Sequence, residues 1–212
     1  MVGANLIFPG KRMDGVAIFE VIDQYQATCA AGVPTVWTNL LDFADKEGRK
    51  MESLRDVVVG GSAAPPWMFT AFREKHGAEL LHAWGMTETS PLGTMNRAIP
   101  QLDDLSPEEK AKTRMKQGRP VFGIDIKIVD EEGKELPRDG ETVGHLLVKG
   151  NWVVHTYFGA DQPAVNDEGW FDTGDMATID RFGYMEIVDR SKDLIKSGGE
   201  WISSVDMEIL AM

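Results

Sequence analysis

The sequence predicts an α/β protein: a parallel-sheet α/β subdomain, then a small antiparallel β-barrel subdomain, then the start of a C-terminal domain after a hinge. Two observations predict this. Up to about residue 117, segments of helical period alternate with strand-like segments, which favours parallel strands joined by right-handed crossovers. Beyond residue 118, short strands of alternating polarity are separated by turns rich in Gly and Asp. We therefore expect domains at residues 1–117, 118–190 and 191–212.

Composition narrows the class of protein. The chain has 212 residues, of which 42% are hydrophobic, enough to bury a sizeable core. Its net charge of −12, without a block of Lys or Arg, argues against nucleic acid and anionic membranes as partners. Cys29 is the single cysteine, so it predicts a buried thiol in a reducing compartment. No apolar run has the length of a membrane span, and we expect a cytoplasmic location without a transmembrane segment.

The first half of the chain is interpreted element by element. Apolar spacing predicts a helix over 16–31, with Asp14 as its N-cap and Gly32 as its end. Five further elements are expected: a buried strand at 33–37, a helix at 39–46, a central parallel strand at 54–59, a helix at 67–75 and a strand at 79–84.

The second half begins with a helix. Ser106, followed by Pro107 and two glutamates, is typical of a helix start. Residues 130–134 are typical of a hairpin turn. Strands are expected at 124–129, 145–149, 152–157, 176–180 and 184–188.

Two glycine-punctuated loops follow predicted parallel strands. Gly60-Gly61-Ser62 would let a ligand approach the backbone, but the same residues also suit a tight strand-to-helix turn. Trp84-Gly-Met-Thr-Glu-Thr-Ser-Pro91 offers an aromatic plane, hydroxyls and a carboxylate that could hold Mg²⁺. The alternative for this second loop is a pair of threonine N-caps with a capping glutamate.

Two later stretches carry charged residues on turns. Gly169-Trp-Phe-Asp-Thr-Gly-Asp175 would place Asp172 and Asp175 on a turn, where a carboxylate accepts ribose hydroxyls or simply closes an Asx turn. The run from Asp189 to Ser203 is typical of a connector that ends in a tight glycine turn before a short strand.

Together and in this order, these four stretches resemble the adenylate-forming superfamily of acyl-CoA synthetases, luciferases and peptide-synthetase adenylation domains. Within it the chain most resembles the medium- and long-chain fatty-acyl-CoA synthetases, on residues 31–37, 59–65 and 197–206. The resemblance implies an acid–thiol ligase. A fatty acid carboxylate would attack the α-phosphate of ATP, with Mg²⁺, and release pyrophosphate; coenzyme A would then displace AMP. The resemblance also leaves a homodimer of the intact enzyme open.

The resemblance assigns roles to individual positions. Gly60, Gly61 and Ser62 would border the adenine and the acyl pocket, which Val33 would also line. Trp84, with Gly85 and Met86, would lie against the adenine. Thr87 would lie near a phosphate and Glu88 would hold Mg²⁺. Asp175 and Arg190 would hold the ribose hydroxyls.

The remaining roles fall near the end of the chain. Lys192 matches the hinge of the family's C-terminal domain, and Trp201 matches the tryptophan that gates the acyl tunnel. Lys196 matches the lysine of the thioester-forming conformation. Thr87, Glu88 and Lys196 are thus the expected catalytic residues.

The sequence departs from the family pattern at both ends. The phosphate-gripping loop that ends in Pro-Lys-Gly and the adenylation lysine are absent from these 212 residues. We therefore expect a fragment of a larger enzyme, inactive alone. Two alternatives stay open: an adenylating enzyme with another acceptor, luciferase-like or carrier-protein, or a non-catalytic remnant. Against a remnant stands the presence of Glu88, Asp175, Arg190 and Lys196.

Overall fold

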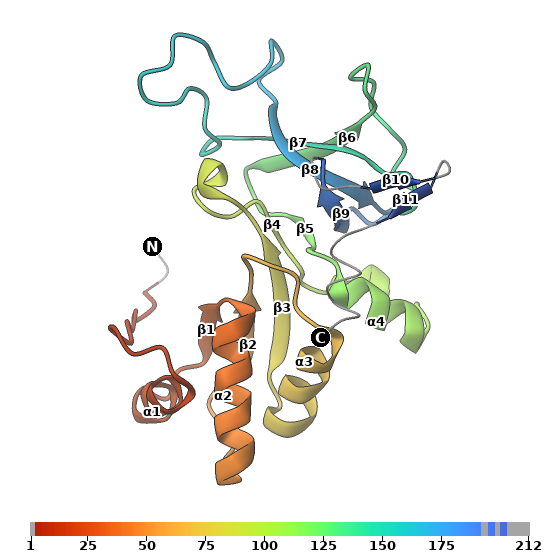
Figure 1. The fold of residues 1–212 in the computed structure, drawn as a ribbon. Coiled ribbons are helices and arrows are strands. Elements are labelled where there is room, and N and C mark those ends of the chain that lie inside the picture. Colours follow the sequence, from red (N-terminus) through yellow and green to blue (C-terminus); the bar gives the residue numbers. More distant parts are fainter. Residues whose placement is uncertain (1–2, 192–194, 198–199, 203–212) are drawn as a thin grey trace. The chain divides into compact units, whose positions relative to one another are not determined.

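The computed structural model describes residues 3–191, 195–197 and 200–202, and only the backbone of the last two segments. It divides into two compact units, Met1–Leu81 and His82–Met212 (Figure 1). The predicted α/β class with a second, antiparallel sheet is confirmed. The predicted division at residues 117 and 190 stays a prediction. No helix in the described part of the chain is long and apolar enough to cross a membrane.

The first unit alternates helices and strands. Its elements are α1 (Gly15–Tyr25), β1 (Cys29–Gly32), α2 (Pro34–Glu47), β2 (Asp56–Val59), α3 (Pro66–Ala71), a π-helical turn (Phe72–His76) and the beginning of β3 (Glu79–Trp84).

Strands β1 and β2 form a parallel pair, of which only β2 lies at a predicted strand, since residues 29–31 were predicted as the end of a helix. Their register runs from Cys29 opposite Asp56 to Gly32 opposite Val59. The Gly60 amide extends the pairing by donating to the Gly32 carbonyl oxygen at 3.2 Å. The carboxyl ends of both strands therefore lie at one edge of the sheet, where Val33 and Gly61 follow them.

Two predicted boundaries in this unit are wrong. Asp14 caps α1 as expected, accepting from the Ala17 amide at 3.0 Å, but the helix ends at Tyr25, where Gln26 turns left-handed with φ 51°. Gly32 therefore ends a strand rather than a helix. The strand predicted at 33–37 is instead the first turn of α2, because Pro34 fits the first helical position, where no backbone donor is needed. Cys29 is exposed on β1, not buried as predicted.

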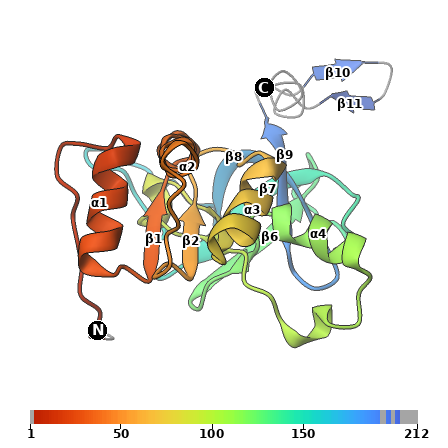
Figure 2. The same ribbon diagram turned by 90° about the horizontal axis from the view of Figure 1, so that it is seen from below.

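Aromatic side chains join the helices of the first unit to its strands. Phe19 of α1 meets Phe43 of α2 edge to face, with ring centroids 5.5 Å apart. Trp37 is buried and its indole nitrogen donates to the Val58 carbonyl oxygen at 3.2 Å, which ties α2 to β2. Figure 2 shows α1 beside β1, the edge strand of the parallel pair.

The second unit contains mostly strands. Its elements are the end of β3, a 3₁₀ turn (Thr87–Thr89), β4 (Thr94–Met95), a 3₁₀ turn (Pro100–Leu102), α4 (Pro107–Met115), β5 (Arg119–Pro120), β6 (Ile124–Val129), β7 (Gly144–Gly150), β8 (Phe171–Ile179), β9 (Met185–Arg190), β10 (Ile195–Ser197) and β11 (Glu200–Ile202).

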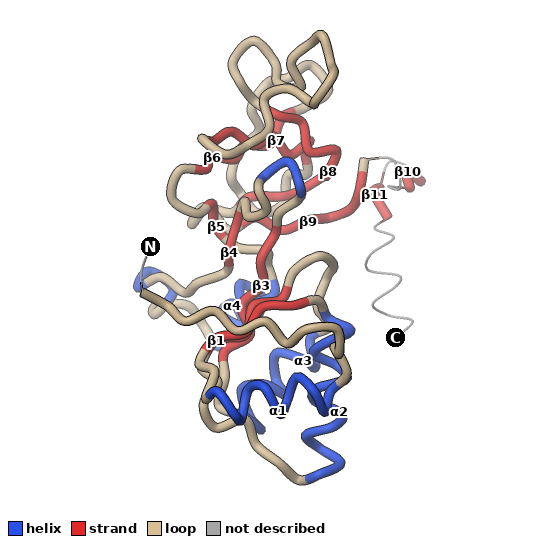
Figure 3. The backbone as a smooth tube through the Cα atoms, turned by 90° about the vertical axis from the view of Figure 1, so that its left-hand side faces the viewer, coloured by secondary structure: helices blue, strands red, loops and turns tan. Residues whose placement is uncertain are grey.

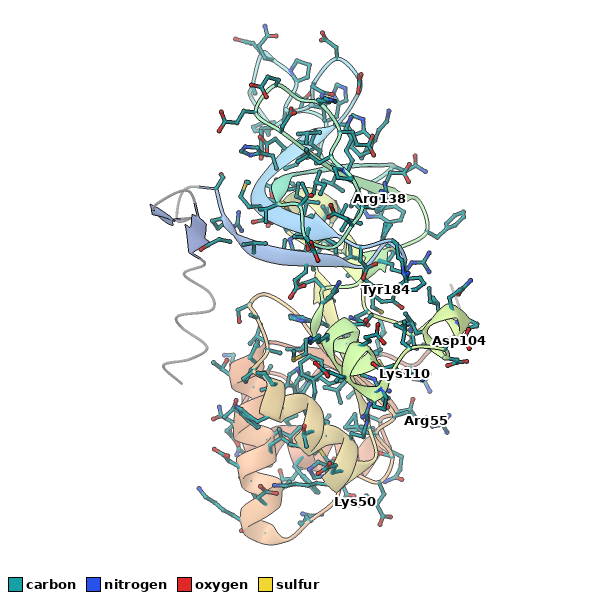
Figure 4. The ribbon with its side chains drawn as sticks, turned by 90° about the vertical axis from the view of Figure 1, so that its right-hand side faces the viewer. Lys50, Arg55, Asp104, Lys110, Arg138 and Tyr184 are labelled. Carbon is teal, nitrogen blue, oxygen red and sulfur yellow. The ribbon has the colours of Figure 1, made fainter. Side chains whose placement is uncertain are left out.

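The predicted start of α4 is confirmed. The Ser106 amide donates to Glu109 Oε2 at 2.8 Å, and the Glu109 amide donates to Ser106 Oγ at 3.2 Å, which is a reciprocal capping box. Lys110 on the same helix, labelled in Figure 4, donates to the Asp103 carbonyl oxygen at 2.8 Å. Tyr184, also labelled, is fully buried and donates to the Arg97 carbonyl oxygen at 2.7 Å.

The second sheet is open rather than a closed barrel. Its strands pair antiparallel in the order β6-β7-β8-β9, and no pairing of β6 with β9 occurs among the described strands. Four strands are few for closure, since small barrels commonly need about eight. Four of the predicted strands are confirmed as β6, β7, β8 and β9, although β8 begins at Phe171, five residues before its predicted start, and residues 180 and 184 lie outside the strands.

The strand predicted at 152–157 is wrong. Residues 151–170 form an irregular connection between β7 and β8, drawn as tan tube in Figure 3. A turn closes directly after β7, where the Val153 amide donates to the Gly150 carbonyl oxygen at 3.2 Å. The next amide, of Val154, donates at 2.8 Å to the carbonyl oxygen of Glu88, outside the four-stranded sheet. These amides therefore bond to a turn and to the loop after β3 instead of to a neighbouring strand.

Strand β8 contains a bulge. Leu147 faces Asp172 and His145 faces Met176, so two steps along β7 correspond to four along β8. Gly174, inside the bulge, has φ 70°. Asp172 and Asp175 were predicted on a turn, but both lie within this bulged strand. The bulge is what changes the direction in which their side chains leave the sheet.

Removing a nearly buried ion pair should destabilise the protein more than removing an exposed one. Lys116 Nζ lies 2.8 Å from Asp180 Oδ2, and the two side chains are only 13% and 14% exposed. We expect Lys116→Met to lower the free energy of unfolding by about 1.5–3 kcal/mol, because a shielded carboxylate loses its charged donor. Urea unfolding measures this.

The matched control is Lys112→Met, which removes the exposed pair of Lys112 with Glu108 on α4. It should cost no more than about 0.5 kcal/mol. Equal effects of the two variants would contradict the prediction.

Candidate nucleotide site

Two predicted site residues meet in the first unit, where the parallel strands end. Gly61 has φ 86°, and a Cβ built there would lie 3.2 Å from Val33 Cγ1. Val33 is 44% exposed, and Gly61 and Ser62 are exposed beside it. A small residue that follows β2 therefore leaves an apolar side chain accessible at the end of β1. Ligands of parallel α/β sheets bind at this edge.

In the second unit, the two threonines of the loop after β3 differ in burial. Thr89 is fully buried; its hydroxyl accepts from the Met86 amide at 2.9 Å and lies within donating distance of the Met86 and Pro91 carbonyl oxygens. Thr87 is exposed and Glu88 is half-buried. Thr89 thus holds the loop in shape, but the capping alternative is only partly right, because Met86 rather than a threonine is the N-cap of the 3₁₀ turn and Thr87 is exposed.

Gly85 is required by the same loop. A Cβ at this position would overlap the Pro91 carbonyl oxygen, so the two ends of the loop approach each other more closely than any side chain permits. This close approach also keeps Met86 half-buried against the core of the second unit. Gly85 therefore lets the two ends of the loop approach each other, and the Met86 side chain packs against the core.

Asp175 is held by two donors from different strands. Trp84 Nε1, at the end of β3, donates to Asp175 Oδ2 at 2.9 Å. Arg190 Nε lies 2.9 Å from Asp175 Oδ1, and the two residues face each other across β8 and β9. The carboxylate is 4% exposed, whereas Arg190 is 58% exposed. Three predicted site residues are thus brought together.

The contact between Trp84 and Asp175 was missed by sequence reasoning. Trp84 was predicted to lie against an adenine, and this role stays a prediction. Its ring is 9% exposed and lies close to Gly93, where even a Cβ would not fit. No sequence signal indicates this hydrogen bond, because the partners are 91 residues apart and meet only through the sheet.

Burial dominates the electrostatics of Asp175. Loss of solvation raises the pKa of its carboxyl group, while the hydrogen bond from Trp84 and the charge of Arg190 lower it and nearby Asp172 raises it. The net direction is upward from 3.8. A carboxylate in this setting gains from further hydrogen-bond donors, such as hydroxyl groups, that replace lost water.

Glu88 is hydrogen-bonded by the loop that follows β7. The Tyr157 hydroxyl donates to Glu88 Oε1 at 2.8 Å, and the Val154 amide donates to the Glu88 carbonyl oxygen at 2.8 Å. Trp152 Nε1 adds a hydrogen bond to the Leu92 carbonyl oxygen at 3.2 Å. The hydrogen bond to Glu88 raises the pKa of Tyr157. Sequence reasoning missed Tyr157, because its segment was interpreted as a strand.

Magnesium fits Glu88 as a single carboxylate ligand. Glu88 Oε2 makes no hydrogen bond or ion pair within the described residues, so it is available to a cation. No group of three or more His, Cys, Asp or Glu that could form a metal cage occurs in that part of the chain. Mg²⁺ does not need one, since it keeps several waters and is commonly held by one or two carboxylates and substrate phosphates.

Three predicted site residues cannot be placed in full. Lys192, the predicted hinge, lies outside the described residues. Lys196 and Trp201 face each other in the antiparallel pair of β10 and β11, for which the backbone alone is described. Their roles stay predictions.

Comparison with known families identifies the family of this chain. The family described as AMP-binding enzyme matches residues 1–158. The chain belongs to this family of AMP-binding enzymes.

Two relatives with curated names are coenzyme A ligases that resemble this chain along its whole length. The chain is 52% identical over 212 residues to 3-methylmercaptopropionyl-CoA ligase from Ruegeria lacuscaerulensis, and 49% identical over 212 residues to medium-chain-fatty-acid–CoA ligase from Ectopseudomonas oleovorans. Both matches cover all of this chain and 39% of the relative, so the chain spans about two fifths of the length of these ligases. The resemblance to medium-chain acyl-CoA synthetases is confirmed.

A solved structure agrees in fold and family. O-succinylbenzoate coenzyme A synthetase from Bacillus subtilis, in complex with ATP and magnesium ion, is 30% identical and superposes with a TM-score of 0.78. The match covers 95% of this chain and 39% of that structure's chain.

The burial of Asp175 predicts a specific pH dependence. Because its pKa is higher in the folded state than in the unfolded chain, its stabilising contribution is fully present below about pH 4 and is lost as pH rises through the folded pKa. The free energy of unfolding of the protein, relative to that of Asp175→Asn, should therefore fall as pH rises through this window. Unfolding in urea at a series of pH values measures it.

Asp125→Asn, at an exposed position on β6, serves as the control for loss of one negative charge. A relative stability that rises with pH would mean that Trp84 and Arg190 outweigh burial.

Proposed function

We propose that this chain takes part in the ATP-dependent ligation of a carboxylic acid to coenzyme A, through an acyl-adenylate. In the first step, a carboxylate oxygen bonds to the α-phosphorus of ATP and pyrophosphate leaves. In the second, the sulfur of coenzyme A bonds to the acyl carbon and AMP leaves. The named relatives, which are coenzyme A ligases, support this reaction class over other acceptors.

The observation that carries the proposal is the Trp84–Asp175–Arg190 cluster. Asp175 is ionisable, almost fully shielded and fixed by donors on both oxygens. Each carboxylate oxygen can still accept a second hydrogen bond. We infer that Asp175 accepts the ribose hydroxyls of the nucleotide, with the exposed guanidinium of Arg190 as the adjacent donor.

The loop after β3 supplies the phosphate end of the proposed site. Thr87 presents its hydroxyl to a phosphate oxygen, and Glu88 presents Oε2 to Mg²⁺. When bound, Mg²⁺ neutralises phosphate charge as the pyrophosphate leaves. Glycines 60 and 61, together with Ser62, border the adenine and the acyl pocket, and Val33 lines the acyl pocket. Lys196 serves the thioester-forming step, with Lys192 as hinge and Trp201 at the acyl tunnel.

The substrate proposed is a fatty acid, and the reaction is proposed to take place in the cytoplasm. The similarity to a medium-chain-fatty-acid ligase supports the substrate class. ATP and coenzyme A are the co-substrates. A homodimer of the intact enzyme is part of the same proposal, and sedimentation velocity tests it.

Calorimetric titration with ATP·Mg²⁺ and with AMP tests the nucleotide contact. The 212-residue polypeptide should bind both. Asp175→Asn should weaken both by about tenfold or more, because the neutral amide offers one acceptor oxygen instead of two and places a donor against Trp84 or Arg190.

Asp172→Asn is the matched control and should bind both nucleotides within about twofold of the unchanged chain. Failure of the unchanged polypeptide to bind either nucleotide would contradict the proposal, as would equal binding by Asp175→Asn.

A further inference from the structure

Residues 152–157 hold the loop after β3 through hydrogen bonds that have no role in the proposed function. Three hydrogen bonds connect the two segments: Val154 N–H to the Glu88 carbonyl oxygen, the Tyr157 hydroxyl to Glu88 Oε1, and the Trp152 indole N–H to the Leu92 carbonyl oxygen. Two of the three end on Glu88. These contacts are therefore concentrated on Glu88, at both its main-chain carbonyl group and its carboxylate.

Core stability does not account for the Tyr157 contact. Tyr157 is 48% exposed and Glu88 is half-buried, so water can replace the hydrogen bond at small cost. The contact does, however, restrict the carboxylate. With its carbonyl held by Val154 and Oε1 held by Tyr157, the Glu88 side chain keeps one orientation and leaves Oε2 open.

We propose that Tyr157 is a positioning residue that orients the Glu88 carboxylate for Mg²⁺ through its hydroxyl group. This inference rests on the proposed function, since it deepens the role of Glu88 at the phosphate end of the site. Partners in the outer shell of a metal site orient the ligand, and their removal commonly lowers metal affinity about 10–100-fold. Tyr157 acts through Glu88 and touches neither nucleotide nor metal.

The variant that isolates the hydroxyl is Tyr157→Phe, which keeps the ring. Its matched control is Tyr25→Phe, the same chemical change at an exposed tyrosine at the end of α1. Mg²⁺ is titrated into each protein at a fixed ATP concentration, and nucleotide binding is followed by calorimetry. Tyr157→Phe should need about tenfold more Mg²⁺ for half-maximal binding, and Tyr25→Phe the same amount as the unchanged chain.

A merely structural role predicts a different result. If Tyr157 only supported the fold, ATP binding would be weakened equally at every Mg²⁺ concentration. In the positioning role, saturating Mg²⁺ restores ATP binding by Tyr157→Phe to that of the unchanged chain. An unchanged Mg²⁺ midpoint, or a loss that saturating Mg²⁺ does not restore, overturns the inference.

A second measurement is independent of nucleotide and separates this inference from the proposed function. The chain has three tyrosines, and ultraviolet absorbance reports their ionisation. Glu88→Gln should lower the pKa of one tyrosine, and Tyr157→Phe should remove that same transition, because the carboxylate holds the phenol protonated. If the chain binds no nucleotide, the proposed function fails, and tyrosine ionisation that is unaffected by Glu88→Gln still overturns the contact on its own.

Discussion

The position of the loop after β3 depends on one buried carboxylate. Asp175 lies in the bulge of β8 at 4% exposure, where an ionised group is unfavourable unless donors replace its water. Trp84 and Arg190 provide those donors, one from the end of β3 and one from β9. The same hydrogen bonds that satisfy the charge therefore fasten the base of the Trp84–Pro91 loop to β8. The backbone that leads to Thr87 and Glu88 in that loop is therefore held in place at Trp84.

A second set of hydrogen bonds fixes the middle of the same loop. Thr89 closes it internally, and residues 152–157 hold it at Glu88 and Leu92. At the proposed nucleotide site, catalysis would depend mainly on positioned charges and hydrogen-bond donors. The described residues hold this loop with hydrogen bonds from its own threonine and from the segment after β7.

The first unit contributes in a simpler way. Its candidate residues follow two parallel strands, and the geometry of parallel strands alone brings Val33 and Gly61 together. An accessible apolar side chain therefore lies next to a backbone without a side chain at that edge.

The sequence by itself determined the family, the α/β class and the positions of most strands, because these depend on local spacing, glycines and short motifs. It also predicted the caps of α1 and α4, where Asp14 and Ser106 lie next to the amides that they bind. It misplaced β1, where the period of residues 29–32 suits a helix equally well and only pairing with β2 selects a strand. Tertiary structure alone decided that Trp84 binds Asp175, that Tyr157 binds Glu88, and that of two threonines one is buried and the other exposed. Such contacts join residues far apart in the chain, and no local pattern records which of them the sheets bring together.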